Sequence, residues 1–489
     1  MRVGLHVGNF ELSMKRIRTL FIILLVIFTL FAARLVQIQG IQSAEYTLKA
    51  ANEMQKTRVI AAPRGDITDI NGVAFARSVS AINIVVDQKM IEDHARVAAF
   101  AAPILGLTVE EVITAITGVK RYSMVLESAE PSTWNRLSLA IDKYNSMLSN
   151  QEYDKRIVGF FPERNYIREY PSGNLVSSLV GFVRKDGLGA SGIELSMNSS
   201  ITGVPGIYSY ARGRGAEIPG SQSEVVAAQA GTTVRLTIDR DIQWVAAKAI
   251  AEAVKSARAS SGTVIVMDPR TGAVLAHATA PTFDPNNTKN VSLELMRNPS
   301  VQDVYEPGST GTVMTLAAAL EEGTISPETV FDVPYKIRRG GEDFKDHDPH
   351  PLQKLTTAGI LAVSSNTGTI KIAETMSHDT LYSYLTKFGI GAKTGAGLPG
   401  ENVGRLLAVK DWSGTTAPTV AFGQGYSLNA MQATSIFATL ANNGIRVSPT
   451  VIAGTSDASG NFTQFKNEKG VQVVSAATAA KMRIMMESV

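Results

Sequence analysis

The sequence predicts an α+β protein with a membrane helix at its N-terminus. The first observation is an uncharged apolar run over residues 20–33. The second is an amphipathic helix pattern between Ile242 and Val254, followed by two β-branched runs, 263–268 and 273–278, on either side of a Pro-Arg-Thr-Gly turn. The third is a composition of 44% hydrophobic and 19% charged residues, which is that of a folded globular protein.

Length and composition exclude several classes of function. The 489 residues leave room for two or three domains, and the absence of cysteine excludes disulfides, thiolate chemistry and Cys-based zinc sites. The net charge is +3, and the first 18 residues hold four basic residues and one acidic residue, so 4 − 1 = +3 and the remainder balances to zero. We therefore expect no nucleic-acid partner, because no basic field is left for one.

A transmembrane helix over residues 17–38 accounts best for the apolar run. The uncharged run alone is shorter than the about 20 residues that a span needs, but apolar residues resume after Arg34, and Arg18 and Arg34 can snorkel to the interfaces. The basic residues before the run place a tail of residues 1–16 in the cytoplasm and the chain after about Gly40 outside. A cleaved signal peptide is the alternative, which a charged residue at the cleavage position disfavours.

Downstream of the anchor the pattern changes several times. Residues 41–57 mix charged and apolar positions and predict a helix that leaves the membrane. Asn71-Gly72 lies between two apolar stretches and predicts a β-hairpin. Residues 80–160 alternate helical patterns with polar connections, and they include a predicted helix over 109–116.

Ser309 stands at the start of another predicted helix. Pro307 and Gly308 end whatever precedes it, apolar residues recur at helical spacing between 313 and 320, and Gly323 is a plausible helix stop. The free N–H groups and positive dipole of a helix N-terminus favour a developing oxyanion, so a nucleophilic serine suits this place. Serine is also a preferred helix cap, and taken alone this stretch favours the cap.

A second stretch, Ser364-Ser365-Asn366, changes that balance. Together with Tyr-Glu-Pro-Gly-Ser-Thr at residues 305–310, it resembles the penicillin-binding protein family, whose signature is Ser-x-x-Lys, then Ser-x-Asn, then Lys-Thr/Ser-Gly. Residues 64–72 also resemble the motif that opens the non-catalytic domain of class B members. The chain is therefore identified as a member of class B, the membrane-anchored peptidoglycan transpeptidases, with the septal cell-division type favoured.

The resemblance implies a domain order. It places an elongated α/β pedestal domain of the dimerisation type ahead of a penicillin-binding transpeptidase domain, in which an antiparallel sheet lies between helix layers. It also implies that the strand with the third motif follows Val489, so that the transpeptidase domain is incomplete at its C-terminus. The expected bounds are 1–16 for the tail, 17–38 for the membrane helix, 41–225 for the pedestal and 231–489 for the transpeptidase domain.

The resemblance also assigns roles to residues. Ser309 would attack the carbonyl between two D-alanines of a peptidoglycan stem peptide, and Ser364 would relay a proton to the leaving amine. Asn366 would hydrogen-bond the substrate amide or the family's lysine. Ser365 is a candidate substrate contact. The resemblance implies no metal and no organic cofactor. It implies stem peptides, β-lactams and membrane proteins of cell division or elongation as partners.

Thr312 occupies the position of the family's lysine, three residues after the serine. A threonine hydroxyl cannot act as a general base near neutral pH, so the change predicts slow acylation of Ser309. A catalytically inactive relative that serves as a scaffold or binding partner in the wall-synthesis complex is the alternative function.

Two further patterns are read as loops and not as functional sites. Lys393-Thr394-Gly395 has the letters of the third motif, but its turn-forming neighbours predict a loop instead of the required strand. His347 and His350 stand among three aspartates, Asp343, Asp346 and Asp348, which could suggest a metal. A solvated polar loop before the second motif is the favoured interpretation. From Ser309 to about Asn442 the pattern is mostly helical.

Overall fold

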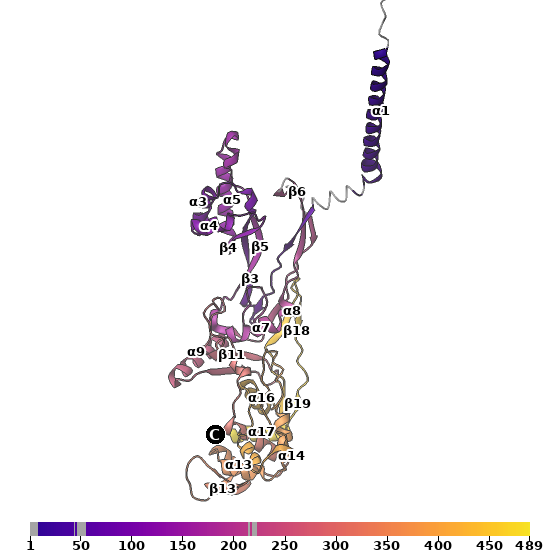
Figure 1. The fold of residues 1–489 in the computed structure, drawn as a ribbon. Helices are drawn as coiled ribbons and strands as arrows, with labels where there is room; N and C mark the ends of the chain where they lie inside the picture. Colours follow the sequence, from indigo (N-terminus) through magenta and orange to yellow (C-terminus); the bar gives the residue numbers. More distant parts are fainter. Residues whose placement is uncertain (1–7, 44, 46–54, 214–215, 218–222) are drawn as a thin grey trace, which may run out of the picture. The chain divides into compact units, whose positions relative to one another are not determined.

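The chain forms two compact units in this computed structural model, which describes all residues except 1–7, 44, 46–54, 214–215 and 218–222 (Figure 1). Unit 1 comprises Met1–Ala61 and Pro205–Ala228, and unit 2 comprises Ala62–Val204 and Gln229–Val489. Both contain helices and strands, and the predicted α+β class is confirmed.

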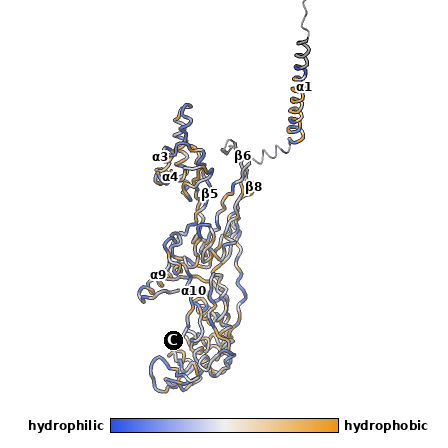
Figure 2. Tube along the Cα trace, in the orientation of Figure 1, coloured by the Kyte–Doolittle hydropathy of each residue, from blue (hydrophilic) through white to orange (hydrophobic). Residues whose placement is uncertain are grey.

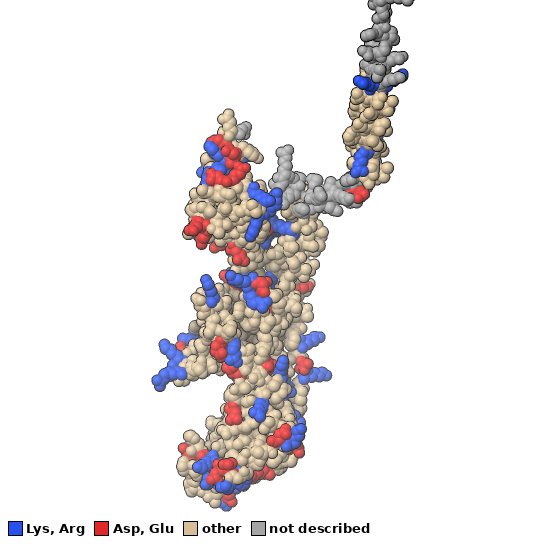
Figure 3. All heavy atoms as spheres, viewed as in Figure 1, with Lys and Arg blue, Asp and Glu red and all other residues tan. Residues whose placement is uncertain are grey.

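Unit 1 begins with one long apolar helix. α1 spans Gly8–Val36 and is followed by a π-helical turn, η1 (Gln37–Ile41). The stretch Arg16–Ile41 is long and apolar enough to cross a membrane. Most of it is orange in Figure 2, and Figure 3 shows basic side chains at both ends of its uncharged middle. The predicted N-terminal apolar helix is confirmed, and it starts inside the stretch predicted as the tail, residues 1–16.

The rest of unit 1 is a small sheet of four strands. β6 pairs antiparallel with β1, β7 and β8. The predicted helix over residues 41–57 lies mostly outside the described residues, and its last three positions belong to β1. The strands are β1 Gln55–Ile60, β6 Gly206–Gly213, β7 Ala216–Glu217 and β8 Ser223–Val226.

Unit 2 is built on a seven-stranded sheet. Its order is β18-β17-β9-β2-β3-β4, with β5 paired to β3, and only β2 and β9 are parallel within the described sheet. The predicted hairpin at Asn71-Gly72 joins β2 to β3: Gly72 has φ +89°, and the Asp69 carboxylate accepts hydrogen bonds from the N–H groups of Asn71 and Val73. The strands are β2 Ile67–Thr68, β3 Ala74–Val86, β4 Ser123–Ala129, β5 Phe160–Glu169, β9 Thr233–Leu236, β17 Ile452–Ser456 and β18 Phe462–Gln464.

Three helices cover the far end of β3, β4 and β5 (Figure 1). The predicted helix over residues 109–116 is confirmed at the same bounds, whereas the mostly helical prediction for 80–160 is wrong where β3, β4 and β5 run. β3 pairs with β5 across more than 70 residues of sequence, and local periodicity cannot show such a partner. The helices are α3 His94–Leu105, α4 Val109–Ile116 and α5 Pro131–Ser146, with 3-10 turns η2 Gln88–Met90 and η3 Asn150–Lys155.

The predicted helix and hairpin after the seven-stranded sheet are also confirmed. β10 and β11 form an antiparallel pair, and alternate β10 residues face opposite helices. Val264 and Val266 pack with α9, while Ile265 and Met267 join a core that includes Met431 of α16. The pair therefore lies between helix layers, as expected for a transpeptidase domain. The elements are α9 Arg240–Ala257, β10 Gly262–Met267, β11 Val274–Ala280 and α16 Ala430–Ala441.

A large apolar core surrounds α11 (Thr312–Glu321), which packs against α13, α14 and α17. The mostly helical prediction for this region missed two short antiparallel pairs, β12 with β15 and β13 with β14. The elements are β12 Val330–Val333, β13 Lys336–Arg339, β14 Glu342–Lys345, β15 Gln353–Thr356, α12 Thr357–Ala362, α13 Asn366–Ala373, α14 His378–Lys387, α15 Thr416–Ala421 and α17 Ala476–Met486.

The remaining elements of unit 2 are helices of one or two turns and strands of two residues. They connect the larger elements, and β16 and β19 form a separate antiparallel pair. They are η4 Gly173–Val176, α6 Ser177–Val180, α7 Gly192–Ser196, α8 Asn198–Ile201, α10 Pro299–Gln302, η5 Gly308–Gly311, η6 Val409–Asp411, β16 Ile445–Arg446 and β19 Val471–Gln472.

Candidate active site

Ser309 lies on a tight turn directly before a buried helix. It belongs to the 3-10 turn η5, in which Gly308 has φ +56°. The Ser309 side chain is exposed, whereas every residue from Thr312 to Leu320 of α11 is buried. The helix predicted from the apolar spacing between 313 and 320 is confirmed, and its burial extends beyond those positions, because core residues surround α11 on all sides. A turn fixed to such a helix presents the serine hydroxyl to solvent on a rigid support.

A glycine-rich segment packs against this turn. The N–H of Gly308 donates to the Gly423 carbonyl at 2.8 Å, and the N–H of Gly425 donates to the Glu306 carboxylate at 3.0 Å. A Cβ atom at Gly423 would lie 1.9 Å from the Gly308 carbonyl oxygen, so no larger residue fits there. The close approach of two backbones therefore fixes Ser309.

Tyr426 completes the support. A Cβ atom at Gly311 would lie 2.4 Å from the Tyr426 hydroxyl, so the ring occupies space that a side chain at 311 would need. Among the described residues the buried Tyr426 hydroxyl has no hydrogen-bond partner. Burial raises the pKa of Tyr426 above that of an ordinary phenol, so this group is neutral and cannot accept a proton from Ser309.

Thr312 begins α11 and is 6% exposed. Its hydroxyl donates to the Ser309 backbone carbonyl at 2.7 Å. This hydrogen bond ties the first turn of the helix to the serine but moves no proton from the Ser309 hydroxyl. That position 312 supplies no base stays a prediction from the sequence.

The second predicted motif lies at the start of α13. Ser364 is exposed and has φ +55°, a left-handed conformation that is unusual for a residue with a side chain. Ser365 caps α13 by accepting the Gly368 N–H at 2.9 Å, and it is 3% exposed. The Asn366 side-chain amide donates to the Lys345 carbonyl at 3.0 Å, which leaves its side-chain oxygen for another partner.

The two motifs share one core. α11 follows Ser309 directly and packs against α13, which begins at Asn366. Motifs more than 50 residues apart in sequence are thus carried by neighbouring helices. Ser309 and Ser364 are both exposed, while Ser365 is buried and turned toward protein. The structure does not favour Ser365 as a substrate contact.

Lys393 lies in a segment without helix or strand, as predicted, and its side chain is exposed. The N–H of Thr394 donates to the Glu401 carboxylate at 2.7 Å, and the Gln432 side-chain amide donates to the Ala392 carbonyl at 2.9 Å. These hydrogen bonds fold the segment onto itself and onto α16. The predicted loop is confirmed.

Two protein-family models match the chain. The penicillin-binding protein transpeptidase domain matches residues 262–489, and the penicillin-binding protein dimerisation domain matches residues 59–236. The penicillin-binding protein PbpB of Mycolicibacterium smegmatis is 32% identical, and the match covers 97% of this chain and 75% of that protein. The chain belongs to the class B penicillin-binding proteins.

Other class B relatives and structures agree. The peptidoglycan D,D-transpeptidase FtsI of Escherichia coli is 30% identical over 80% of this chain and 65% of that protein. A peptidoglycan synthetase structure from Bifidobacterium adolescentis is 30% identical with a TM-score of 0.71, covering 89% of this chain and 82% of its own. Penicillin-binding protein 3 of Mycobacterium tuberculosis, in complex with aztreonam, is 29% identical with a TM-score of 0.66, covering 88% and 75%.

Sequence reasoning missed two neighbours of the second motif. The Asp346 carboxylate accepts a hydrogen bond from the Ser365 hydroxyl at 2.7 Å, and His350 contacts the same carboxylate at 2.9 Å. The predicted solvated polar loop is wrong at these positions, because the side chains are only 9% and 15% exposed. The i, i+4 spacing of Asp346 and His350 was the available signal. No cluster that could hold a metal occurs among the described residues.

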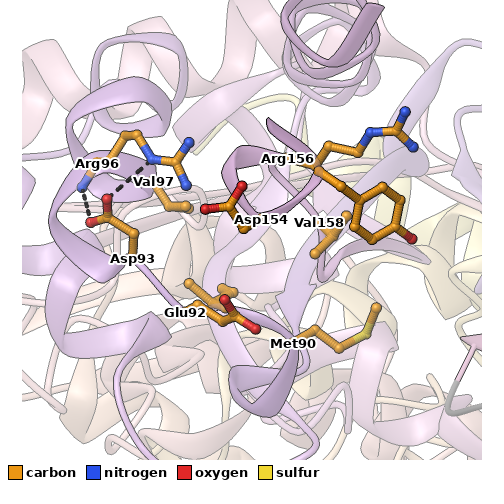
Figure 4. Close-up of a pocket in the computed structure, with 10 residues that line it drawn as sticks. Met90, Glu92, Asp93, Arg96, Val97, Asp154, Arg156 and Val158 are labelled. Carbon is orange, nitrogen blue, oxygen red and sulfur yellow. Dashed lines mark hydrogen bonds and ion pairs between the residues drawn. The ribbon is translucent and has the colours of Figure 1, made fainter. Parts of the chain in front are cut away.

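A pocket of about 200 Å³ lies in another part of unit 2 (Figure 4). The residues that line it come from the segments 90–97 and 153–158, beside the three-helix end of the sheet. The Arg96 guanidinium pairs with Asp93 at 3.2 Å, and the Arg156 guanidinium lies 4.7 Å from the centre of the Tyr153 ring. None of the site residues predicted from sequence lines this pocket.

Proposed function

We propose that this chain is a penicillin-binding, membrane-anchored peptidoglycan D,D-transpeptidase of cell-wall synthesis, with Ser309 as its nucleophile. One observation carries the proposal: Ser309 is exposed on a turn that is fixed between a fully buried helix and a glycine-rich support. This arrangement lies inside the region that matches the transpeptidase family model. The named relatives that are D,D-transpeptidases support the same activity.

In the proposed reaction the Ser309 oxygen forms a bond to the carbonyl carbon between the two terminal D-alanines of a stem peptide. The Ser309 hydroxyl proton passes through Ser364 to the D-alanine nitrogen, the C–N bond breaks, and D-alanine leaves as the free amine. The amine of a second stem peptide then attacks the acyl-enzyme, one of its N–H protons returns to Ser309, and the new amide bond is the crosslink. Asn366 holds the substrate amide. β-Lactams acylate Ser309 in the same way.

We also propose that acylation of Ser309 is slow. With Thr312 at the lysine position, no base stands one helical turn from Ser309, and a positioned base typically contributes about 10²–10⁴-fold. The alternative function is that of an inactive relative acting as a scaffold in the wall-synthesis complex, and Thr312 is the observation behind it.

A fluorescent penicillin separates the two functions. The full chain in membrane vesicles is labelled alongside a Ser309→Ala variant, and the labelled peptide is identified by mass spectrometry. We expect slow labelling at Ser309 that is lost in the variant. Absence of labelling in the unaltered chain after prolonged incubation, while the fold is intact by circular dichroism, would support the scaffold and contradict the enzyme.

For topology we propose a single span with the N-terminus in the cytoplasm and the rest of the chain outside. The support is the basic side chains at Arg16 and Arg18 ahead of the apolar stretch. Within the chain, we propose a tail at 1–16, a span at 17–38, a pedestal at 41–225 and a transpeptidase domain at 231–489. As partners in the membrane we propose proteins of cell division or elongation.

Protease added to intact spheroplasts tests this orientation. We expect digestion of nearly the whole chain, with a fragment that contains the span protected. Full protection would contradict the proposed topology. Accessibility of an N-terminal epitope tag from outside the spheroplast would indicate the opposite orientation.

A further inference from the structure

The loop after β14 holds the start of α13. The Asp346 carboxylate accepts hydrogen bonds from the Ser365 hydroxyl at 2.7 Å and the Thr367 N–H at 2.8 Å, while the Thr367 hydroxyl donates to the Pro334 carbonyl at 2.7 Å. Both donors to Asp346 belong to the N-terminal end of α13. A carboxylate is favoured at this place, because the N–H groups there are free and the helix dipole is positive.

The loop holds two consecutive residues of the second motif. Lys345 accepts the Asn366 amide through its backbone carbonyl, and Asp346 holds Ser365. Ser364, immediately before them, has φ +55° although it is not a glycine. A conformation of this kind persists only when its surroundings fix the chain. The contacts of Asp346 fix the residues that follow Ser364, so they also hold the Ser364 hydroxyl in place.

His350 holds Asp346 in turn. Its Nε2 lies 2.9 Å from the Asp346 carboxylate and its Nδ1 lies 2.7 Å from the Pro351 carbonyl. Carboxylate and carbonyl oxygens only accept hydrogen bonds, so both contacts are hydrogen bonds only when both ring nitrogens carry a proton. The geometry therefore corresponds to the imidazolium form of His350.

One charged group dominates the surroundings of His350. Hydrogen bonds to the Pro351 carbonyl and then to Asp346 raise the pKa of His350 above its ordinary value. Asp346 is the only charged residue among the described ones that contributes to this shift. From other elements, the Tyr335 ring lies edge-on with a centroid distance of 5.9 Å, and α13 presents the uncharged hydroxyls of Ser365 and Thr367.

We propose that Asp346 and His350 are positioning residues for the second motif. The ion pair clamps the start of α13 and thereby orders Ser364 and Asn366 for acylation, and loss of the His350 proton loosens the clamp. This inference rests on the proposed function, because it assigns these two residues to the same active site.

The first test measures the clamp without using activity. Hydrogen exchange of the peptide that contains the Thr367 and Gly368 N–H groups is followed by mass spectrometry in the full chain and in Asp346→Ala. The matched control is Asp348→Asn, an exposed carboxylate two residues further along the same loop. We expect faster exchange in Asp346→Ala only. Equal protection in all three proteins would overturn the clamp.

The second test measures acylation by fluorescent penicillin from about pH 5.5 to about pH 8.5, the range in which histidine titrates. Asp346→Ala should slow acylation about 10- to 100-fold, as expected for a misplaced catalytic group. His350→Gln keeps one donor but cannot titrate, so the ratio of wild-type to variant rates should fall as pH rises. His347→Gln, an exposed histidine of the same loop, should match wild type.

The outcomes are distinguishable. Asp346→Asn, which still accepts one of the hydrogen bonds, should retain an intermediate rate. A ratio for His350→Gln that does not change with pH would overturn the inference, as would an Asp346→Ala rate equal to wild type. If the unaltered chain is not acylated at any pH, the proposed function fails, and the exchange experiment alone then decides whether the clamp exists.

Discussion

The two motifs of the candidate active site are held by different forces. The turn at Ser309 rests on close backbone contacts with Gly423 and on a helix that is buried on all sides. The stretch at Ser364 rests on hydrogen bonds to one carboxylate, Asp346, which a histidine holds in place. Steric support does not depend on pH, whereas ionic support does. The first motif should therefore respond to added volume, and the second to protonation.

The largest expected effect comes from supplying the missing base at the first motif. Thr312→Lys should raise the rate of acylation by penicillin about 10²–10⁴-fold, because an amine one turn from Ser309 can accept its proton. Thr312→Met introduces a side chain similar in shape to lysine but without a base, so its acylation rate should not rise. The rate of labelling by a fluorescent penicillin is measured for both variants. Equal rates in the Lys and Met variants would show that position 312 does not control activation.

The next effect tests the steric support of Ser309. Gly423→Ala places a methyl group 1.9 Å from the Gly308 carbonyl in a residue with φ +83°. It should cost about 3 kcal/mol and lower the thermal midpoint by several degrees. Gly460→Ala has a similar φ of +85° but open space around it, so it should cost only about 1 kcal/mol. A cost at Gly423 no larger than that at Gly460 would argue against the close contact.

A smaller effect tests the ionic support of the second motif. The hydrogen bonds of His350 to Pro351 and Asp346 raise its pKa in the folded protein above the unfolded value. Such a group stabilises the fold fully below its unfolded pKa of about 6.5, and this contribution is lost as pH rises through the folded pKa. The difference in thermal midpoint between wild type and His350→Gln should therefore shrink from pH 6 to pH 8. A constant difference would contradict the ion pair.

The smallest effect compares two buried hydroxyls near the first motif. The Thr315 hydroxyl donates to the Ala421 carbonyl at 2.8 Å, whereas the Tyr426 hydroxyl is unpaired among the described residues. Tyr426→Phe should be neutral or stabilise the protein by about 1 kcal/mol, while Thr315→Val should destabilise it by about 1 kcal/mol. Differential scanning fluorimetry measures both shifts. Destabilisation by Tyr426→Phe would reveal a partner for its hydroxyl.

The sequence by itself determined the elements that depend on local pattern. The helix over residues 109–116, the helix and hairpin that start at Arg240, and the turn at Asn71-Gly72 follow from helical spacing, strand alternation and glycine geometry. The short motifs around Ser309 and Ser364 also identified the family, because their residue types and order can be recognised in the sequence without knowledge of the fold. They also predict that position 312 lacks the family's base, because Thr312 stands there.

Only the tertiary structure decided which distant residues meet. The pairing of β3 with β5 and the burial of α11 on every side depend on partners far along the chain, which no local period encodes. The same holds for the contact of Asp346 with Ser365, 19 residues apart, which turned a loop expected to be solvated into the support of a motif. Local spacing specifies a helix face or a turn, but packing specifies what that face or turn touches, because the energy of burial depends on neighbours brought together by the whole fold.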